Sequence, residues 1–238
     1  MANIARVSHV EGVEIPCEAG VLNGDLVVPA RARGIVIFAH GSGSSRLSAR
    51  NRFVAGALQR AEIGTLLMDL LTMQEERREQ AGAMLRFDVA LLAQRLASAA
   101  RWLRTTSVGR DQPIGYFGAS TGAAAALIAC AVHEPYDVAA VVSRGGRPDL
   151  AGSDILSDVR APTLLLVGGD DYDVLGLNRA AYAHLRCERR LEIIKGATHL
   201  FEEPGTLEEV TDYARDWFLR FMPAREAAQA TERQSRSL

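Results

Sequence analysis

The sequence lacks both the cysteine pattern and the long apolar run that would place the chain outside a reducing aqueous compartment. It has three cysteines, at positions 17, 130 and 187; an odd number at such wide spacings indicates neither a disulfide framework nor a metal site. No apolar run is long enough to cross a bilayer, and residues 1–15 lack the apolar segment of a secretory signal. We therefore expect a cytoplasmic protein with no membrane partner and no metal.

An excess of charge of either sign is also missing. The formal net charge is −2 over 238 residues, so no basic surface indicates a nucleic-acid partner. Apolar residues make up 48% of the chain, which is typical of a globular protein with a substantial core. We expect one domain over residues 1–223, followed by a polar tail over 224–238 that frays because it has no aromatic residue to anchor it.

Within this domain, β-rich segments alternate with helical ones. Two early strands, 6–15 and 20–29, are expected to pair as an antiparallel hairpin. Further strands are expected over 34–40, 64–71, 113–118, 137–146, 161–169 and 189–196. Helices are expected over 49–61, 87–105, 121–133, 176–187 and 206–222. This alternation predicts an α/β fold with a mostly parallel, eight-stranded, doubly wound sheet flanked by helices.

Two local expectations concern helix surfaces and ends. The charged run QEERREQ, residues 74–80, is expected to be a solvated face and not a binding patch. Thr206 is expected to cap the last helix, with Glu209 completing a capping box.

One serine stands at the end of a predicted strand between two glycines. Ser120 lies in Gly-Ala-Ser-Thr-Gly, residues 118–122, and an alanine-rich helix follows. In a doubly wound sheet, sites lie at the carboxyl ends of the strands, and a sharp strand-to-helix turn exposes such a serine as a nucleophile. The alternative is a glycine-lined turn in which Ser120 only caps the helix. The motif alone does not decide between them.

A serine nucleophile needs a base, and His199 is the best placed of five histidines. It alone follows the last strand in a loop, behind Gly196 and Ala197, where an imidazole has reach and rotational freedom. The others end or lie within strands or helices, at positions 9, 40, 133 and 184. The alternative for His199 is an ordinary surface loop residue.

The acid that would orient His199 is expected in the loop after strand 161–169. Asp170, Asp171 and Asp173 compete there, and position within the loop favours Asp171. At least one of the three is expected to serve as a turn or capping residue. Weaker candidates in the preceding connection are Asp149, Asp154 and Asp158.

The segment HGSGSS, residues 40–45, follows the strand 34–40. It lacks the Gly-Lys-Ser/Thr ending of a phosphate-binding P-loop and the third glycine of a dinucleotide fingerprint, so we expect no cofactor. We expect the backbone N–H of Ser42 to join that of Thr121 in an oxyanion hole. His40 would support the loop by packing or hydrogen bonding. The alternative is a plain flexible loop.

With these pieces in place, the chain resembles the α/β-hydrolase superfamily, and most of all the lid-less dienelactone-hydrolase-like serine esterases. The matching segments are VIFAHGSGSS, GYFGASTGA, PTLLLVGGDDYDV and IIKGATHLFEEPG, in the family's order, within residues 10–222. The resemblance implies that Asp171 is the acid, through the pattern G-x-x-D-x-x-V over residues 168–174, and supports His199. Dienelactone hydrolases themselves have a cysteine where this chain has Ser120, and this departure from the family pattern argues against dienelactone as the substrate.

A helical lid is not expected, because only about 20 residues separate the strands near 142 and 163. The site should be open, with residues 72–84 as one possible rim. The function expected is a serine hydrolase of carboxylic esters with small or medium acyl groups, acting through an acyl-enzyme as a monomer or homodimer. Alternatives are other acyl chemistry of the same triad (a thioesterase, acyltransferase, perhydrolase or dienelactone-type hydrolase) or a non-catalytic ligand-binding member.

Overall fold

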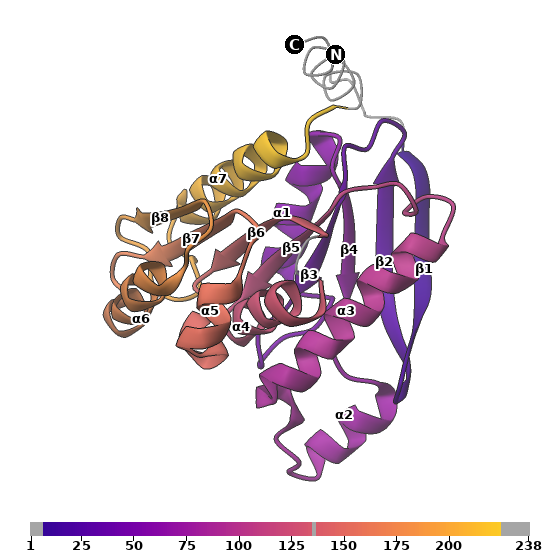
Figure 1. The fold of residues 1–238 in the computed structure, drawn as a ribbon, viewed down its shortest axis with the longest axis horizontal. Coiled ribbons are helices and arrows are strands. Elements are labelled where there is room, and N and C mark those ends of the chain that lie inside the picture. The colour runs from indigo at the N-terminus through magenta and orange to yellow at the C-terminus, as the bar shows by residue number, and fades with distance from the viewer. Residues whose placement is uncertain (1–6, 135–136, 225–238) are drawn as a thin grey trace.

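The chain folds around one eight-stranded sheet, as seen in a computed structural model that describes residues 7–134 and 137–224 (Figure 1). The strand order is β1-β2-β4-β3-β5-β6-β7-β8. The strands are β1 (Val7–Cys17), β2 (Gly20–Pro29), β3 (Ile35–Ala39), β4 (Gly64–Met68), β5 (Ile114–Ala119), β6 (Val138–Arg144), β7 (Thr163–Gly168) and β8 (Arg189–Ile194). β2 pairs antiparallel with β1 and β4, and all other pairs are parallel.

Helices cover both faces of this sheet. They are α1 (Ala49–Arg60), α2 (Met73–Gln80), α3 (Val89–Thr105), α4 (Thr121–Ile128), α5 (Ser153–Asp158), α6 (Tyr172–His184) and α7 (Thr206–Phe221). Short helical turns are η1 (Leu85–Phe87), η2 (Ala129–His133) and η3 (Pro148–Ala151). Between β6 and β7 the chain makes only η3 and α5, so no cap domain is inserted there.

The core consists of two apolar layers, one on each face of the sheet. One layer packs α3, α4 and α6 against β1–β7, and the other packs α1 and α7 against the opposite face (Figure 1). Every residue of β3, β4, β5 and β7 is buried, as expected for parallel strands covered by helices on both faces. The carboxyl ends of these strands therefore lie at one well-supported edge.

The predicted sheet and hairpin are confirmed, α2 and α5 are helices that were not predicted, and two predicted helices differ at their amino ends. α6 begins at Tyr172, four residues before the predicted start, because the aspartate loop leads directly into its first turn. The predicted cap of α7 is wrong: the chain enters this helix through Gly205, with φ 84°, and the Thr206 hydroxyl donates to the Glu203 carbonyl. Residues of the predicted tail beyond 224 lie outside the described part of the chain.

The charged run at 74–80 forms most of α2. The expectation that these residues form a solvated face is only partly right, because Glu75 and Glu79 are buried. Thr72 caps the helix and Glu75 completes the capping box. Glu75 is 6% exposed and forms an ion pair of 2.6 Å with Arg95 of α3, which is 3% exposed. Burial by itself would raise the pKa of Glu75, but hydrogen bonds from Thr72 and Arg95 outweigh it and lower this pKa. α2 is thus fixed to α3 by a buried ion pair.

This ion pair predicts an acid-dependent part of the stability. Because the pKa of Glu75 is lower in the folded than in the unfolded chain, its contribution is complete above about pH 4.5 and is lost as the pH falls through the folded value. Glu75→Gln should therefore flatten the acid limb of the unfolding free energy. The measurement is urea unfolding between about pH 3.5 and 7.

Arg95→Met should be far more damaging at neutral pH, because it leaves the buried Glu75 carboxylate without a partner. The expected loss is about 3–5 kcal/mol. Arg78→Met, on the exposed surface of the same helix α2, is the matched control and should change stability by less than about 0.5 kcal/mol. Equal stability of these two variants would contradict the assignment.

Candidate active site

Ser120 occupies a strained turn between β5 and α4. Its backbone has φ 51° and ψ −122°, a conformation that costs free energy for any residue other than glycine. The flanking glycines are required by backbone contacts. A Cβ at Gly118 would lie 2.4 Å from the Cα of Ala123, and one at Gly122 would lie 2.3 Å from the carbonyl oxygen of Ala39. The Gly-x-Ser-x-Gly spacing therefore matches the space available.

The side chain of Ser120 does not cap the helix. Ser120 is the N-cap residue of α4 by position, yet its hydroxyl makes no capping hydrogen bond. Its backbone is held instead: the N–H donates to the Arg144 carbonyl (3.3 Å), and the carbonyl accepts from Ala123 and Arg147 (3.1 and 3.0 Å). The alternative of a simple capping serine is wrong, and the hydroxyl is left available.

His199 and Asp171 form a hydrogen-bonded pair at the same edge of the sheet. The Nδ1 of His199 lies 2.7 Å from Oδ2 of Asp171, and their side chains are 38% and 13% exposed. Asp171 is the N-cap residue of α6 but makes no capping bond, so its carboxylate is directed at the imidazole. The competing Asp170 and Asp173 are exposed. The structure thus pairs His199 with the aspartate that the family pattern indicates.

The weaker acid candidates lie elsewhere. Asp149 receives two hydrogen bonds from Arg147, at 2.9 and 2.8 Å. The Asp154 carboxylate accepts a long bond of 3.5 Å from the Ser153 hydroxyl, and Asp158 belongs to α5. None of these three reaches His199 in the described contacts.

Gly145 lies between the turn at Ser120 and the loop over residues 195–205 that carries His199, called the histidine loop below. A Cβ at Gly145 would lie 3.1 Å from the carbonyl oxygen and 3.6 Å from Nδ1 of His199, and Gly145 directly follows Arg144, whose carbonyl holds Ser120. Across residues 7–134 and 137–224, no hydrogen bond joins Ser120 to His199. Catalytic hydrogen bonds are often long without substrate, so this geometry is compatible with a serine–histidine pair.

A tight turn after β3 lies against Ser120. The Ser44 N–H donates to the Gly41 carbonyl (3.0 Å), which closes a turn over residues 41–44. A Cβ at Gly41 would lie 3.1 Å from Cβ of Ser120. In the part of the chain described, neither the Ser42 N–H nor the Thr121 N–H has an acceptor; Thr121 opens α4, whose first N–H groups have no partner within the helix.

His40 supports this turn. Its Nδ1 lies 2.9 Å from the Gly41 carbonyl oxygen. Burial lowers the pKa of His40, more than the Gly41 carbonyl and the nearby Asp69 raise it. The ring is therefore neutral at pH 7 and donates its Nδ1 proton to the carbonyl. This is the supporting role expected for His40, and not that of a base.

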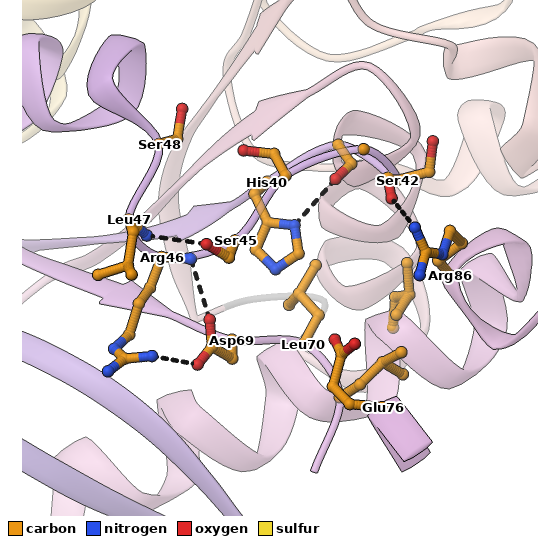
Figure 2. Close-up of a pocket in the computed structure, with 15 residues that line it drawn as sticks. His40, Ser42, Ser45, Arg46, Leu47, Ser48, Asp69, Leu70, Glu76 and Arg86 are labelled. Atoms are coloured by element: carbon orange, nitrogen blue, oxygen red, sulfur yellow. Dashed lines mark hydrogen bonds and ion pairs between the residues drawn. The ribbon is translucent and has the colours of Figure 1, made fainter. Parts of the chain in front are cut away.

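A cavity of about 540 Å³ opens beside the turn (Figure 2). Its apolar wall consists of Leu70, Leu71 and Leu92. The far end of the loop is fixed by Arg46, whose backbone N–H and Nη1 donate to Asp69 at 3.0 and 2.6 Å. The rest of the cavity lining consists of residues 40–48, Asp69, Glu76 and Arg86. Part of residues 72–84, expected at the rim, thus borders the cavity.

Arg144 is a residue that sequence reasoning missed. Its side chain is buried between α1 and the histidine loop, where it makes a 3.5 Å contact with Asn51 and lies 5.9 Å from the ring centre of Phe201. Burial, reinforced by the nearby Arg50, lowers its pKa to about 10. No carboxylate in the described residues pairs with it. Only its position at a strand end could have indicated it beforehand.

The described residues contain neither a cluster suited to a metal ion nor a membrane-spanning helix. No group of three or more His, Cys, Asp or Glu side chains there is arranged to hold a metal ion. None of the helices described combines the length and the apolar character needed to cross a membrane.

Comparison with known proteins places this geometry in context. No protein-family model matches the chain. A protein of two Mycobacterium tuberculosis strains, named a phosphoribosyl transferase, is 55% identical over 210 residues, or 88% of this chain and 46% of that protein. The chain thus spans less than half the length of these curated relatives.

Solved structures match along almost the whole chain. An α/β serine hydrolase without lid from Xanthomonas campestris is 19% identical, covers 91% of this chain and 97% of its own, and has a TM-score of 0.72, which shows the shared fold. The crystal structure of dienelactone hydrolase from Anabaena variabilis is 50% identical over 90% of this chain and 98% of its own, with a TM-score of 0.87. At this identity and coverage, the chain belongs to the dienelactone-hydrolase-like family of the α/β hydrolases.

Proposed function

We propose that the chain is a serine hydrolase of carboxylic esters, with Ser120 as nucleophile, His199 as base and Asp171 as the acid that orients it. The observation that carries this proposal is the 2.7 Å hydrogen bond between His199 and Asp171, at the sheet edge where Ser120 is held in a left-handed turn. A hydroxyl is a weak nucleophile until a neighbouring base removes its proton.

In the proposed reaction, Nε2 of His199 takes the hydroxyl proton as Ser120 attacks the ester carbonyl. Asp171 keeps the proton on Nδ1, so that Nε2 is the basic nitrogen, and stabilises the imidazolium that forms. The imidazolium then protonates the leaving alcohol. Water, activated by the same histidine, releases the acid from the acyl-enzyme and regenerates Ser120.

The negative oxygen of the tetrahedral intermediate would be bound by the N–H groups of Ser42 and Thr121. Both are free of other acceptors in the described part of the chain, and both belong to segments packed against Ser120. Donors fixed before the reaction stabilise developing charge without reorganisation. The cavity beside the turn, with its leucine wall, would accommodate one side of the ester.

The names of two relatives bear on the substrate. Because the Anabaena variabilis relative is named a dienelactone hydrolase, a lactone belongs in the substrate panel beside linear esters. The name phosphoribosyl transferase is not transferred to this chain, because the chain spans 46% of the protein that carries it. Thioesters and alternative acyl acceptors test the other chemistry open to such a triad.

Ser120→Ala should abolish ester hydrolysis, because no other group of the proposed triad can form the acyl-enzyme. We expect kcat/KM for a p-nitrophenyl ester to fall by about 10⁴-fold or more. A fluorophosphonate probe should label the wild-type chain at Ser120 and leave the variant unlabelled. Equal hydrolysis by the two proteins would refute the proposal.

Asp171→Asn should lower kcat by about 10³–10⁴-fold, because the amide favours the wrong imidazole tautomer. The chain supplies its own controls in Asp170 and Asp173, which are exposed neighbours of the same residue type. Asp170→Asn and Asp173→Asn should stay within a few-fold of the wild type. Steady-state kinetics on one ester, with thermal melting to verify folding, compares all three. A large loss at Asp170 or Asp173 instead would reassign the acid.

Ser42→Pro tests the backbone donor directly, because proline removes the N–H and fits the second position of a tight turn. We expect kcat to fall about 10²–10³-fold, as for the loss of one oxyanion donor. Ser42→Ala keeps the N–H and should retain activity within a few-fold. Similar kinetics for the proline and alanine variants would exclude this N–H from the oxyanion hole.

A further inference from the structure

We propose that Arg86 is a positioning residue for the turn over residues 41–44, and that it holds the central peptide of this turn, between Ser42 and Gly43, in one of its two orientations. This inference rests on the proposed function and adds a residue that lies outside the triad and the two oxyanion donors. It follows from the contacts of Arg86, from the conformation of the turn and from the way in which α2 is anchored.

Arg86 reaches the turn from η1, on the side of the cavity. Its Nη1 donates to the carbonyl oxygen of Ser42 at 3.1 Å (Figure 2). Its Nε lies 2.5 Å from Oε1 of Glu79, so the guanidinium is held between a carboxylate and a backbone carbonyl. Such a two-sided arrangement fixes the direction of the donated hydrogen bond.

Glu79 is a firm support for this arginine. Its side chain is 4% exposed, and its Oε2 also accepts from the N–H groups of Leu85 and Arg86. Burial opposes the ionisation of Glu79, but the hydrogen bonds from Arg86 and from these amides outweigh it and lower its pKa. The carboxylate is thus ionised at neutral pH and fixes η1 to α2, which the buried pair of Glu75 and Arg95 fixes to α3.

The hydrogen bonds within the turn fix only the first of its peptide planes, so the central peptide would be free to rotate without Arg86. The Gly41 carbonyl is held twice, by the Ser44 N–H and by the His40 ring, which fixes the first peptide plane and hence the direction of the Ser42 N–H. The next plane, between Ser42 and Gly43, is the central peptide of the turn. Its carbonyl is held by Arg86.

Gly43 is what makes the flipped orientation accessible. Two common turns differ by a flip of the central peptide, and the flipped form requires φ of about +80° at the third residue, where glycine is favoured. Gly43 lies outside this left-handed region in the structure. A flip would reverse the dipole of the central peptide next to the Ser42 N–H. The hydrogen bond from Arg86 opposes this flip.

The test is ester hydrolysis by the full chain with Arg86→Gln, which removes the charge and the fork of donors. We expect kcat to fall by about 10-fold at nearly unchanged KM, less than for the loss of the donor itself. Arg86→Lys, which cannot hold both partners in the same geometry, should give a smaller loss in the same parameter. Arg77→Gln, on the exposed side of α2, is the control and should match the wild type.

Rescue by Gly43→Ala separates a peptide lock from a merely structural role. A Cβ at residue 43 meets no atom within 4 Å, so alanine fits, and it disfavours the left-handed conformation of the flipped turn. The double variant Arg86→Gln with Gly43→Ala should therefore recover most of the lost kcat. Arg86→Gln kinetics equal to those of Arg77→Gln, or a loss that Gly43→Ala does not restore, would overturn the proposal.

Failure of this inference is distinguishable from failure of the proposed function. Fluorophosphonate labelling of wild-type Ser120 is measured first, and its absence would reject the serine hydrolase itself. If labelling occurs, its rate in the Arg86→Gln variant provides a second measure, which should slow by about the same factor as kcat. Should Arg86→Gln fail to fold in thermal melting, the Arg86→Lys variant with and without Gly43→Ala decides the question by the same criteria.

Discussion

The contact on which the site depends is that of α4 with the end of β3. Gly122 approaches so closely that a Cβ there would lie 2.3 and 2.6 Å from the carbonyl oxygens of Ala39 and His40. This approach has two consequences. It forces the chain to turn sharply at Ser120, and it brings the open amino end of α4 beside the turn that follows β3. The strained serine and both candidate oxyanion donors are therefore products of one backbone contact, which only glycine allows.

A second contact of the same kind positions the other half of the site. A Cβ at Gly168, the last residue of β7, would lie 2.4 and 2.7 Å from the carbonyl oxygens of Ala197 and Thr198. The histidine loop is thus pressed onto the end of β7, from which the chain continues directly to Asp171. This close approach brings the loop that carries His199 beside Asp171, where the two side chains form their 2.7 Å hydrogen bond. Parallel strands place their carboxyl ends along one edge, and glycines at these ends let the following loops touch.

These backbone contacts at the strand ends explain which site residues could be predicted from the sequence and which could not. Ser120, Asp171 and His199 were identifiable as candidates because each follows a predicted strand at a recognisable spacing, although only the strands before Ser120 and Asp171 are fully buried. The burial of Glu75 and Glu79 in α2 was not, because a carboxylate in a charged run looks the same whether it meets solvent or an arginine. Their partners, at positions 95 and 86, are set by the packing of α2 on α3 and by the turn at η1. Ion pairs of this kind are tertiary contacts, and a charge pattern does not specify them.

Unfavourable local features collect at this one edge of the molecule. Four residues other than glycine have positive φ in the described chain, and three of them lie here: Ser120, Phe201 in the histidine loop, and Met84 just before η1. Arg144, which no carboxylate of the described residues pairs with, lies 5.9 Å from the ring centre of Phe201, and burial lowers its pKa because it disfavours the charged form. Strain of this kind persists only where surrounding packing over-determines it, and the fully buried strands β3, β5 and β7 supply that packing. Residues other than glycine avoid positive φ, and buried charges are paired, in most of the structure. Both preferences are violated where the proposed chemistry takes place, as is common at functional sites.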